Sequence, residues 1–232
     1  MESFRNQDMR AEQRLGEFMD DYFYSKLTAK DGGDISFKRM SDRDSQLQGI
    51  DVCIETAGRK MIIDEKASVY YSNAMIPTFA FELDSIQRGH KEPVEGWFIN
   101  DSLATEYYML IWPNVKCSQV DGKWIRRDIG DIRKEDFTIV EAMLIEKSDI
   151  RITLEHAGYS RNHLIEYAKR FRAMNEPVVT KKEEQVIENV KIMYSSQLAE
   201  KPINLVIRKE LLRDLAKAVY LISPDGFATI KG

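Results

Sequence analysis

Cysteine, histidine and long apolar runs are scarce in this chain of 232 residues. Its two cysteines, Cys53 and Cys117, are too few and too isolated for a disulfide framework or a zinc site. His90, His156 and His163 do not have the spacing of an HExxH helix or a zinc finger. No window approaches the roughly 20 apolar residues of a membrane-spanning helix, and the polar N-terminus is unlike a signal peptide. We therefore expect no membrane partner and, by default, a cytoplasmic location.

Several short enzyme motifs are also missing. No glycine-rich phosphate loop precedes a helix and no Gly-x-Ser-x-Gly elbow appears, which argues against nucleotide-binding enzymes and serine hydrolases of those types. The formal net charge of −4 does not suggest an avid, nonspecific nucleic-acid binder. A local basic surface could still bind phosphates in a weak, salt-sensitive way. Four basic clusters are interpreted as solvated surface rather than groove contacts: Arg126-Arg127, Arg133-Lys134, Lys169-Arg170 with Arg172, and Lys181-Lys182.

The composition is that of a globular α/β protein. Apolar residues make up 43% and charged residues 31%, and the length is sufficient to bury a core without disulfides or metals. We expect residues 1–147 to form an α/β core and residues 148–232 a mostly helical C-terminal extension packed on it, with a soft boundary at Pro177. Strands are predicted at residues 78–83, 97–99, 107–112, 137–145, 203–207 and 219–222, and helices at 150–156, 160–172, 182–198 and 209–217.

Two of these segments allow a nucleic-acid interpretation. The helices around Gly158 have the layout of a helix-turn-helix, but any tight helical hairpin looks the same. Asn162, His163 and Glu166 are not a convincing set for reading bases. The aromatic strands between residues 78 and 112 could stack bases, although core packing is the commoner use of such residues.

The most informative stretch is residues 50–66. Two Val- and Ile-rich runs, 50–54 and 61–66, flank a break at Gly58, which is typical of a β-hairpin. Because side chains alternate along a strand, Asp64 and Lys66 share one face and Glu65 points to the other. An even register places Asp51 directly across from Asp64, with Cβ atoms roughly 5 Å apart.

Two carboxylates at that separation repel each other unless a cation lies between them. A divalent metal removes the conflict, and Mg²⁺ commonly binds one or two carboxylates together with substrate phosphate. Lys66, on the same face, could hold the attacking water or neutralise developing negative charge. The alternative is a surface hairpin with ordinary solvated charges, which the spacing alone leaves equally open.

A third carboxylate comes from upstream. Residues 8–27 have apolar side chains at the three-to-four spacing of an amphipathic helix. Glu12 falls within the inward arc near Met19 and Phe23, where a carboxylate is costly unless it is paired or binds metal. It could also be a Glu at the edge of the stripe, close to the helix start, where negative charge is favoured.

Three features follow one another along the chain: Glu12 in a predicted helix, Gly-Ile-Asp51-Val, and Asp64-Glu65-Lys66-Ala-Ser. This succession resembles the PD-(D/E)XK nuclease superfamily, which has the restriction-endonuclease-like fold. The resemblance covers roughly residues 8–115. It implies a mixed β-sheet core flanked by helices, on which Glu12, Asp51, Asp64 and the backbone carbonyl of Glu65 hold Mg²⁺ or Mn²⁺. Lys66 would assist the attacking water.

The chain departs from the family pattern in two ways. Ile50 replaces the proline before the aspartate, and the tripeptide holds two acids. A one-residue slip would place Glu65 rather than Asp64 across from Asp51 and would misplace Lys66.

The expected activity is a metal-dependent nuclease, with DNA favoured over RNA because the resembling family mostly cuts DNA. Two other classes stay open: an inactive nuclease-fold module that binds nucleic acid or protein, and a structural subunit whose acids are solvated surface. The oligomeric state, including a homodimer, also stays open.

Overall fold

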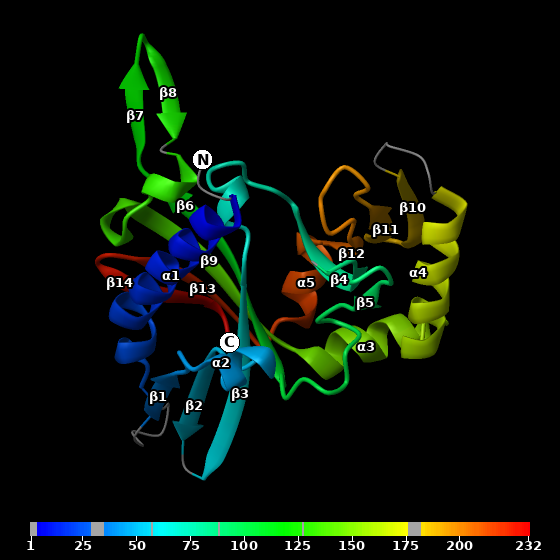
Figure 1. Cartoon of the computed structure of the whole chain (residues 1–232). Helices are drawn as coiled ribbons and strands as arrows, with labels where there is room; N and C mark the ends of the chain where they lie inside the picture. Colours follow the sequence, from blue (N-terminus) through cyan, green and yellow to red (C-terminus); the bar gives the residue numbers. More distant parts are fainter. Residues whose placement is uncertain (1–3, 29–34, 57, 88, 127, 176–181) are drawn as a thin grey trace.

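The protein folds into two β-sheets flanked by helices, in a computed structural model that describes residues 4–28, 35–56, 58–87, 89–126, 128–175 and 182–232 (Figure 1). The larger sheet has seven strands in the order β1-β2-β3-β6-β9-β13-β14. All neighbours in it are antiparallel except β3 and β6. The strands are β1 (Ile35–Arg39), β2 (Val52–Thr56), β3 (Arg59–Ala67), β6 (Tyr107–Val115), β9 (Phe137–Glu146), β13 (Ala218–Ser223) and β14 (Gly226–Lys231). The expectation of an α/β fold with a mixed sheet is confirmed.

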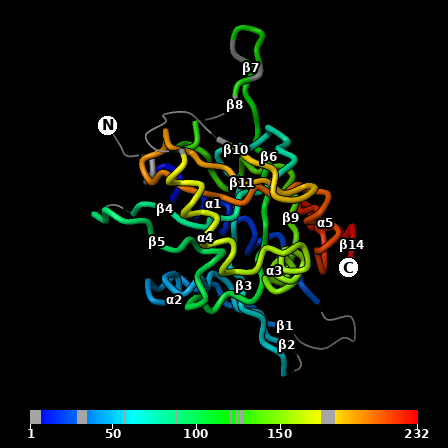
Figure 2. Tube along the Cα trace, turned by 90° about the vertical axis from the view of Figure 1, so that its right-hand side faces the viewer, coloured from blue at the N-terminus to red at the C-terminus, as the bar shows by residue number. Residues whose placement is uncertain are grey.

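The smaller sheet has five strands in the order β10-β11-β12-β4-β5. These are β10 (Lys182–Ile187), β11 (Val190–Tyr194), β12 (Ile203–Arg208), β4 (Thr78–Ser85) and β5 (Val94–Glu95). A separate hairpin of β7 (Cys117–Val120) and β8 (Lys123–Arg126) projects from the end of β6, and Figure 2 shows the same projection after a quarter turn. The helices are α1 (Phe4–Tyr22), α2 (Arg43–Leu47), α3 (Lys147–His156), α4 (Arg161–Asn175) and α5 (Lys209–Leu215).

Strand β6 separates two hydrophobic cores. Tyr107, Met109 and Ile111 face the core that α1 covers, where Leu15, Phe18 and Met19 of the predicted amphipathic stripe are buried. Alternate residues Tyr108, Leu110 and Trp112 face the other core, which the five-stranded sheet, α3 and α4 complete. Because β6 is covered on both faces, almost every residue in it is apolar and buried.

Most predicted elements are present, but two predictions are wrong. Residues 97–99 form a turn, in which Ile99 N donates to Gly96 O at 3.1 Å. Residues 182–194 form the hairpin of β10 and β11 instead of a helix. Val190, Ile192 and Tyr194 are buried at a spacing of two, and Asn189 adopts the positive φ that a tight turn requires.

The C-terminal part also differs from a mostly helical extension. From residue 147 on, the chain forms helices α3, α4 and α5 and also five strands, of which β13 and β14 join the seven-stranded sheet through β9. Pro177, Arg127 and Lys181 lie outside the described residues. Among the described helices, none is both long and apolar enough to cross a membrane.

Candidate functional site

A cleft opens where β3 continues past the end of β2. The last paired residues are Val52 and Ile63, so Glu65 to Ala67 have no β2 partner. Asp51 N still donates to Ile63 O at 3.0 Å, just before the two strands part. The cleft has a volume of about 830 Å³. We call it the β3 cleft; its lining includes Glu12, Gly16, Arg39, Asp51, Glu65, Lys66, Phe79 and Trp97.

Asp51 and Asp64 meet as the hairpin register predicts. Continuing the pairing of Val52 with Ile63 by one residue places Asp51 opposite Asp64. One oxygen of Asp51, Oδ2, accepts a hydrogen bond from the main-chain N of Glu65 at 2.8 Å. This bond satisfies an N–H that β2 no longer covers.

Asp64 lies beneath the cleft, with only 1% of its surface exposed. Its Oδ1 accepts a bond from Lys66 Nζ at 2.5 Å, whereas Oδ2 has no hydrogen-bond partner among the described residues. Gly49 closes over it: a Cβ at this positive-φ position would lie 3.6 Å from Asp64 Oδ2 and 2.4 Å from Thr105 Oγ1. Only a glycine allows this close approach.

Burial is the main cause of an unusual pKa at Asp64. Loss of water raises the pKa of this carboxyl from its ordinary 3.8 to about 7, and Lys66 opposes the rise. The nearby Asp51 adds to it by charge repulsion and by accepting a hydrogen bond from the protonated carboxyl, a bond that is lost when Asp64 ionises. At neutral pH the Asp64 carboxyl is therefore poised between its neutral and its charged form.

Lys66 stays charged in this setting. Burial lowers the pKa of its ammonium group, but Asp64, Asp51 and Glu12 together outweigh that effect and the net direction is upward. Nζ also lies 5.3 Å from the centroid of the Trp97 ring. A fixed ammonium group thus stands beside the aspartate pair, as the sequence predicts.

Glu12 reaches the same cleft from α1. Its side chain is exposed rather than turned into the core, so it sits at the edge of the apolar stripe and not within it. Partial loss of water raises its pKa, Lys66 lowers it, and Asp8 and Asp51 raise it. These effects show that Glu12 is within electrostatic range of both Lys66 and Asp51.

The Glu65 side chain points to the opposite face, as alternation predicts. Its oxygens accept bonds from Tyr24 Oη at 2.8 Å and from Arg39 Nη1 at 2.5 Å. Arg39 also pairs with Asp20 of α1 at 2.8 Å. This network joins α1, β1 and β3, so any share of Glu65 in metal binding belongs to its main-chain carbonyl.

Sequence reasoning missed two groups near Asp64. Tyr108 is its neighbour in the parallel β3–β6 pairing, and the tyrosine hydroxyl is buried without a described hydrogen-bond partner. The charge of Asp64 also reaches Lys147, where burial lowers the ammonium pKa to about 8. Neither group has a local sequence signature, because both depend on pairing between segments more than 40 residues apart.

Glu82 of β4 is half-buried. It accepts a bond from Ser85 Oγ at 3.2 Å, and burial raises its pKa while Lys66 lowers it. It is a further acid within electrostatic range of Lys66.

Among the residues that the structure describes, no three His, Cys, Asp or Glu side chains form a ready-made metal-binding group. The chemistry of the donors nevertheless fits a hard cation. Asp51 and Glu12 line the cleft, and Asp64 keeps one buried oxygen without a partner. Carboxylate oxygens of this kind are the ligands that Mg²⁺ and Mn²⁺ prefer.

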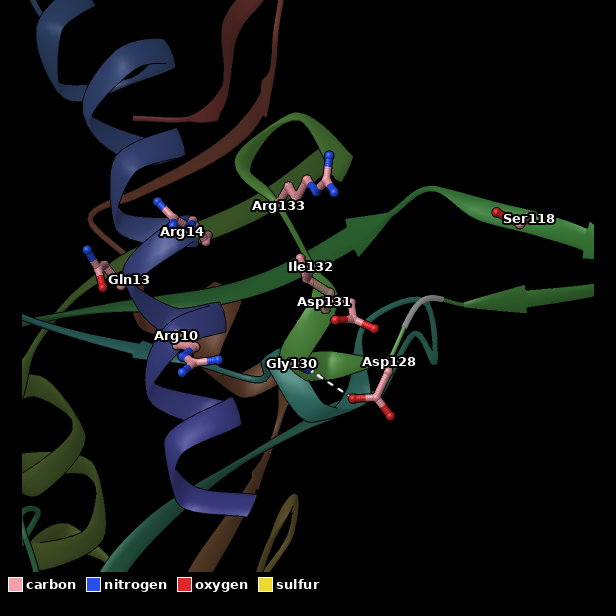
Figure 3. A pocket seen from close by; sticks show the side chains of 9 residues that line it. All are labelled: Arg10, Gln13, Arg14, Ser118, Asp128, Gly130, Asp131, Ile132 and Arg133. Atoms are coloured by element: carbon pink, nitrogen blue, oxygen red, sulfur yellow. Dashed lines mark hydrogen bonds between the residues drawn. The ribbon is translucent and has the colours of Figure 1, made fainter. Parts of the chain in front are cut away.

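A second hollow, of about 730 Å³, lies between α1 and residues 128–133 (Figure 3). Gln13 lines both this hollow and the β3 cleft. The cations that line the second hollow are Arg10, Arg14 and Arg133. Arg14 is ion-paired with Glu17 at 2.9 Å. Two aspartates, Asp128 and Asp131, share the lining, so the hollow carries little excess positive charge.

The apo protein should lose stability as the pH rises from about 4 to about 7. Folding favours the protonated form of Asp64 throughout this window, since its folded pKa of about 7 lies above the ordinary 3.8. Chemical denaturation in chelator at several pH values measures the slope. Asp64→Asn should flatten it; an equally steep slope in that variant would contradict the assigned shift.

Comparisons of the chain with protein-family models, curated proteins and solved structures gave no match.

Proposed function

We propose that this protein is a metal-dependent nuclease that uses Mg²⁺ or Mn²⁺ to hydrolyse phosphodiester bonds, with DNA the favoured substrate. One observation carries the proposal. A buried carboxylate oxygen of Asp64 has no hydrogen-bond partner among the described residues, although Asp51 stands opposite and Lys66 beside it. A buried polar atom without a partner is costly, and a cation here would remove that cost together with the repulsion between the aspartates.

The strand arrangement supports the same class. An antiparallel β2–β3 hairpin continues into the parallel β3–β6 pair, and α1 packs against the sheet and supplies Glu12. This is the arrangement that the resemblance to the PD-(D/E)XK superfamily implies, and we extend it to a restriction-endonuclease-like core.

Each residue has a distinct role in the proposed reaction. Glu12, Asp51 and Asp64, with the carbonyl of Glu65, would hold the cation, which when bound supplies a Lewis acid and lowers the pKa of a water. Lys66 donates from Nζ, which orients the attacking water or neutralises charge on the phosphoryl oxygens. Asp51 keeps its position through the Glu65 N–H bond, which leaves its second oxygen for the cation.

Incubation with plasmid, linear and single-stranded DNA and with RNA tests the proposal. Cleavage should require Mn²⁺ or Mg²⁺, stop with chelator and disappear in Asp51→Asn. Asp44→Asn, an exposed aspartate of α2, is the matched control and should cleave normally. Wild-type protein that cleaves nothing with either metal, or an Asp51→Asn variant with full activity, would refute the assignment.

A binding module on the same scaffold is the second candidate. The Lys66 ammonium already neutralises one oxygen of Asp64 at 2.5 Å, as a site without a metal would require. Such a module would bind nucleic acid or protein with the same affinity when a chelator removes metal ions.

A further inference from the structure

A second pocket, of about 500 Å³, adjoins the β3 cleft. Glu12, Ala67, Phe79 and Ala80 line both, so the two hollows lie side by side. We call it the tyrosine pocket, after Tyr70 and Tyr71 in its lining. We propose that it binds one unpaired nucleobase next to the phosphate in the cleft, which makes the substrate a single-stranded or locally unpaired nucleic acid. This inference rests on the proposed nuclease function.

The lining has the character of a base-binding site. Its walls are mainly apolar, with Ile76, Phe79 and Met193 contributing. Tyr70 and Tyr71 remain 62% and 55% exposed, although large aromatic side chains are usually buried. Their rings meet edge to face, with centroids 5.2 Å apart and planes almost perpendicular. Stacking on such a ring is the usual way in which proteins bind unpaired bases.

The backbone that carries the two tyrosines is held in place before any ligand arrives. They belong to the short helical turn η2 (Val69–Tyr71), which directly follows β3. Tyr71 N donates to Ser68 O at 3.1 Å, and Ser68 Oγ donates to Ile111 O of β6 at 3.2 Å. Ser72 Oγ closes the turn through Val69 O at 2.6 Å. A platform anchored in this way loses little conformational entropy when it binds.

The charged side chains in the lining of the tyrosine pocket favour a base over a second phosphate as its occupant. Asp8 and Glu12 both line the tyrosine pocket. Among the described residues, Lys191 is the cation that lines the pocket, and it is paired with Glu183 at 2.8 Å. Glu12 is assigned to the cation, but the Asp8 carboxylate repels a phosphate and can accept a hydrogen bond from the amino group of a base. The preferred occupant is therefore an uncharged ring with donor groups.

The size of the pocket requires the bound base to be unpaired. Its volume lies within the range of pockets that enclose one small molecule, and a base inside it cannot remain in a stacked duplex. Duplex DNA would need to extrude the base first, at a cost of a few kcal/mol.

An oligonucleotide that carries 2-aminopurine tests the inference. Binding is measured with Mg²⁺ in the Lys66→Met background, so that cleavage does not consume the probe. Fluorescence should fall when the single strand binds, and an abasic analogue should bind about tenfold more weakly. The Tyr70→Ala/Tyr71→Ala double variant should lose a similar factor. The corresponding double Phe variant should keep its affinity, as should Met75→Ala, an exposed neighbour outside the pocket lining.

The two proposals fail in different ways. The base site would be overturned if the protein bound intact and abasic strands equally well, even if the enzyme cleaves DNA. It would also be overturned if the wild-type protein and the double Ala variant bound the intact strand with equal affinity. Duplex DNA that competes as well as the single strand would also overturn it. Fluorescence quenching that depends on the tyrosines, without cleavage by the wild-type protein, would support the base site and refute the nuclease.

Discussion

Lys66→Met should reduce metal-dependent cleavage by about 10³-fold, because it removes a fixed ammonium group from the place where negative charge develops. The variant should fold, since Met fills the volume of the aliphatic chain. Loss of Lys66 also removes the charge that opposes the high pKa of Asp64, so this carboxyl should titrate at a still higher pH. Single-turnover cleavage across a pH series measures both effects.

Lys60→Met is the matched control for this experiment. Lys60 lies on the same strand, exposed and away from the cleft. Its loss should leave the rate within about twofold, since surface substitutions of this kind have small effects. If Lys60→Met and Lys66→Met reduced the rate equally, the assigned role of Lys66 would be wrong.

Arg39→Met should lower the free energy of unfolding by about 3 kcal/mol. The substitution leaves Glu65 and Asp20 without their shared cation, and Glu65 keeps only 11% side-chain exposure. Removing one partner of a largely buried ion pair is costly because the other charge stays buried. Urea denaturation at neutral pH measures the change.

Glu65→Gln provides the comparison, because the amide keeps an acceptor for Tyr24 without the negative charge. In the double variant Arg39→Met/Glu65→Gln, part of the loss should be recovered. Strictly additive effects would mean that the two side chains do not interact.

The hairpin and the β3 cleft were predictable from the sequence because their geometry is local. Alternation placed Asp64 and Lys66 on one face and Glu65 on the other, and the short turn fixed Asp51 opposite Asp64. The amphipathic spacing of α1 likewise identified Leu15, Phe18 and Met19 as buried. Each inference used residues close together in the chain.

The errors came from long-range pairing and from short polar segments. Residues 182–198 were predicted to form a helix, but β12 supplies a strand edge with which β11 pairs, and tertiary pairing outweighs helix propensity. Tyr108 and Lys147 approach Asp64 only because β3 pairs in parallel with β6 and β9 pairs with β6 in turn. The tyrosine pocket similarly combines α1, β3, β4 and β11.

The central claim is that Asp51 and Asp64 bind a divalent cation between them. Titration of the wild-type protein with Mn²⁺, followed by calorimetry, tests it without any assumption about substrate. We predict one saturable site whose affinity increases as the pH is raised through about 7, where Asp64 loses its proton. Asp64→Asn should abolish the site while the fold is retained. Absence of binding to the folded wild-type protein, or unchanged binding in Asp64→Asn, would contradict the claim.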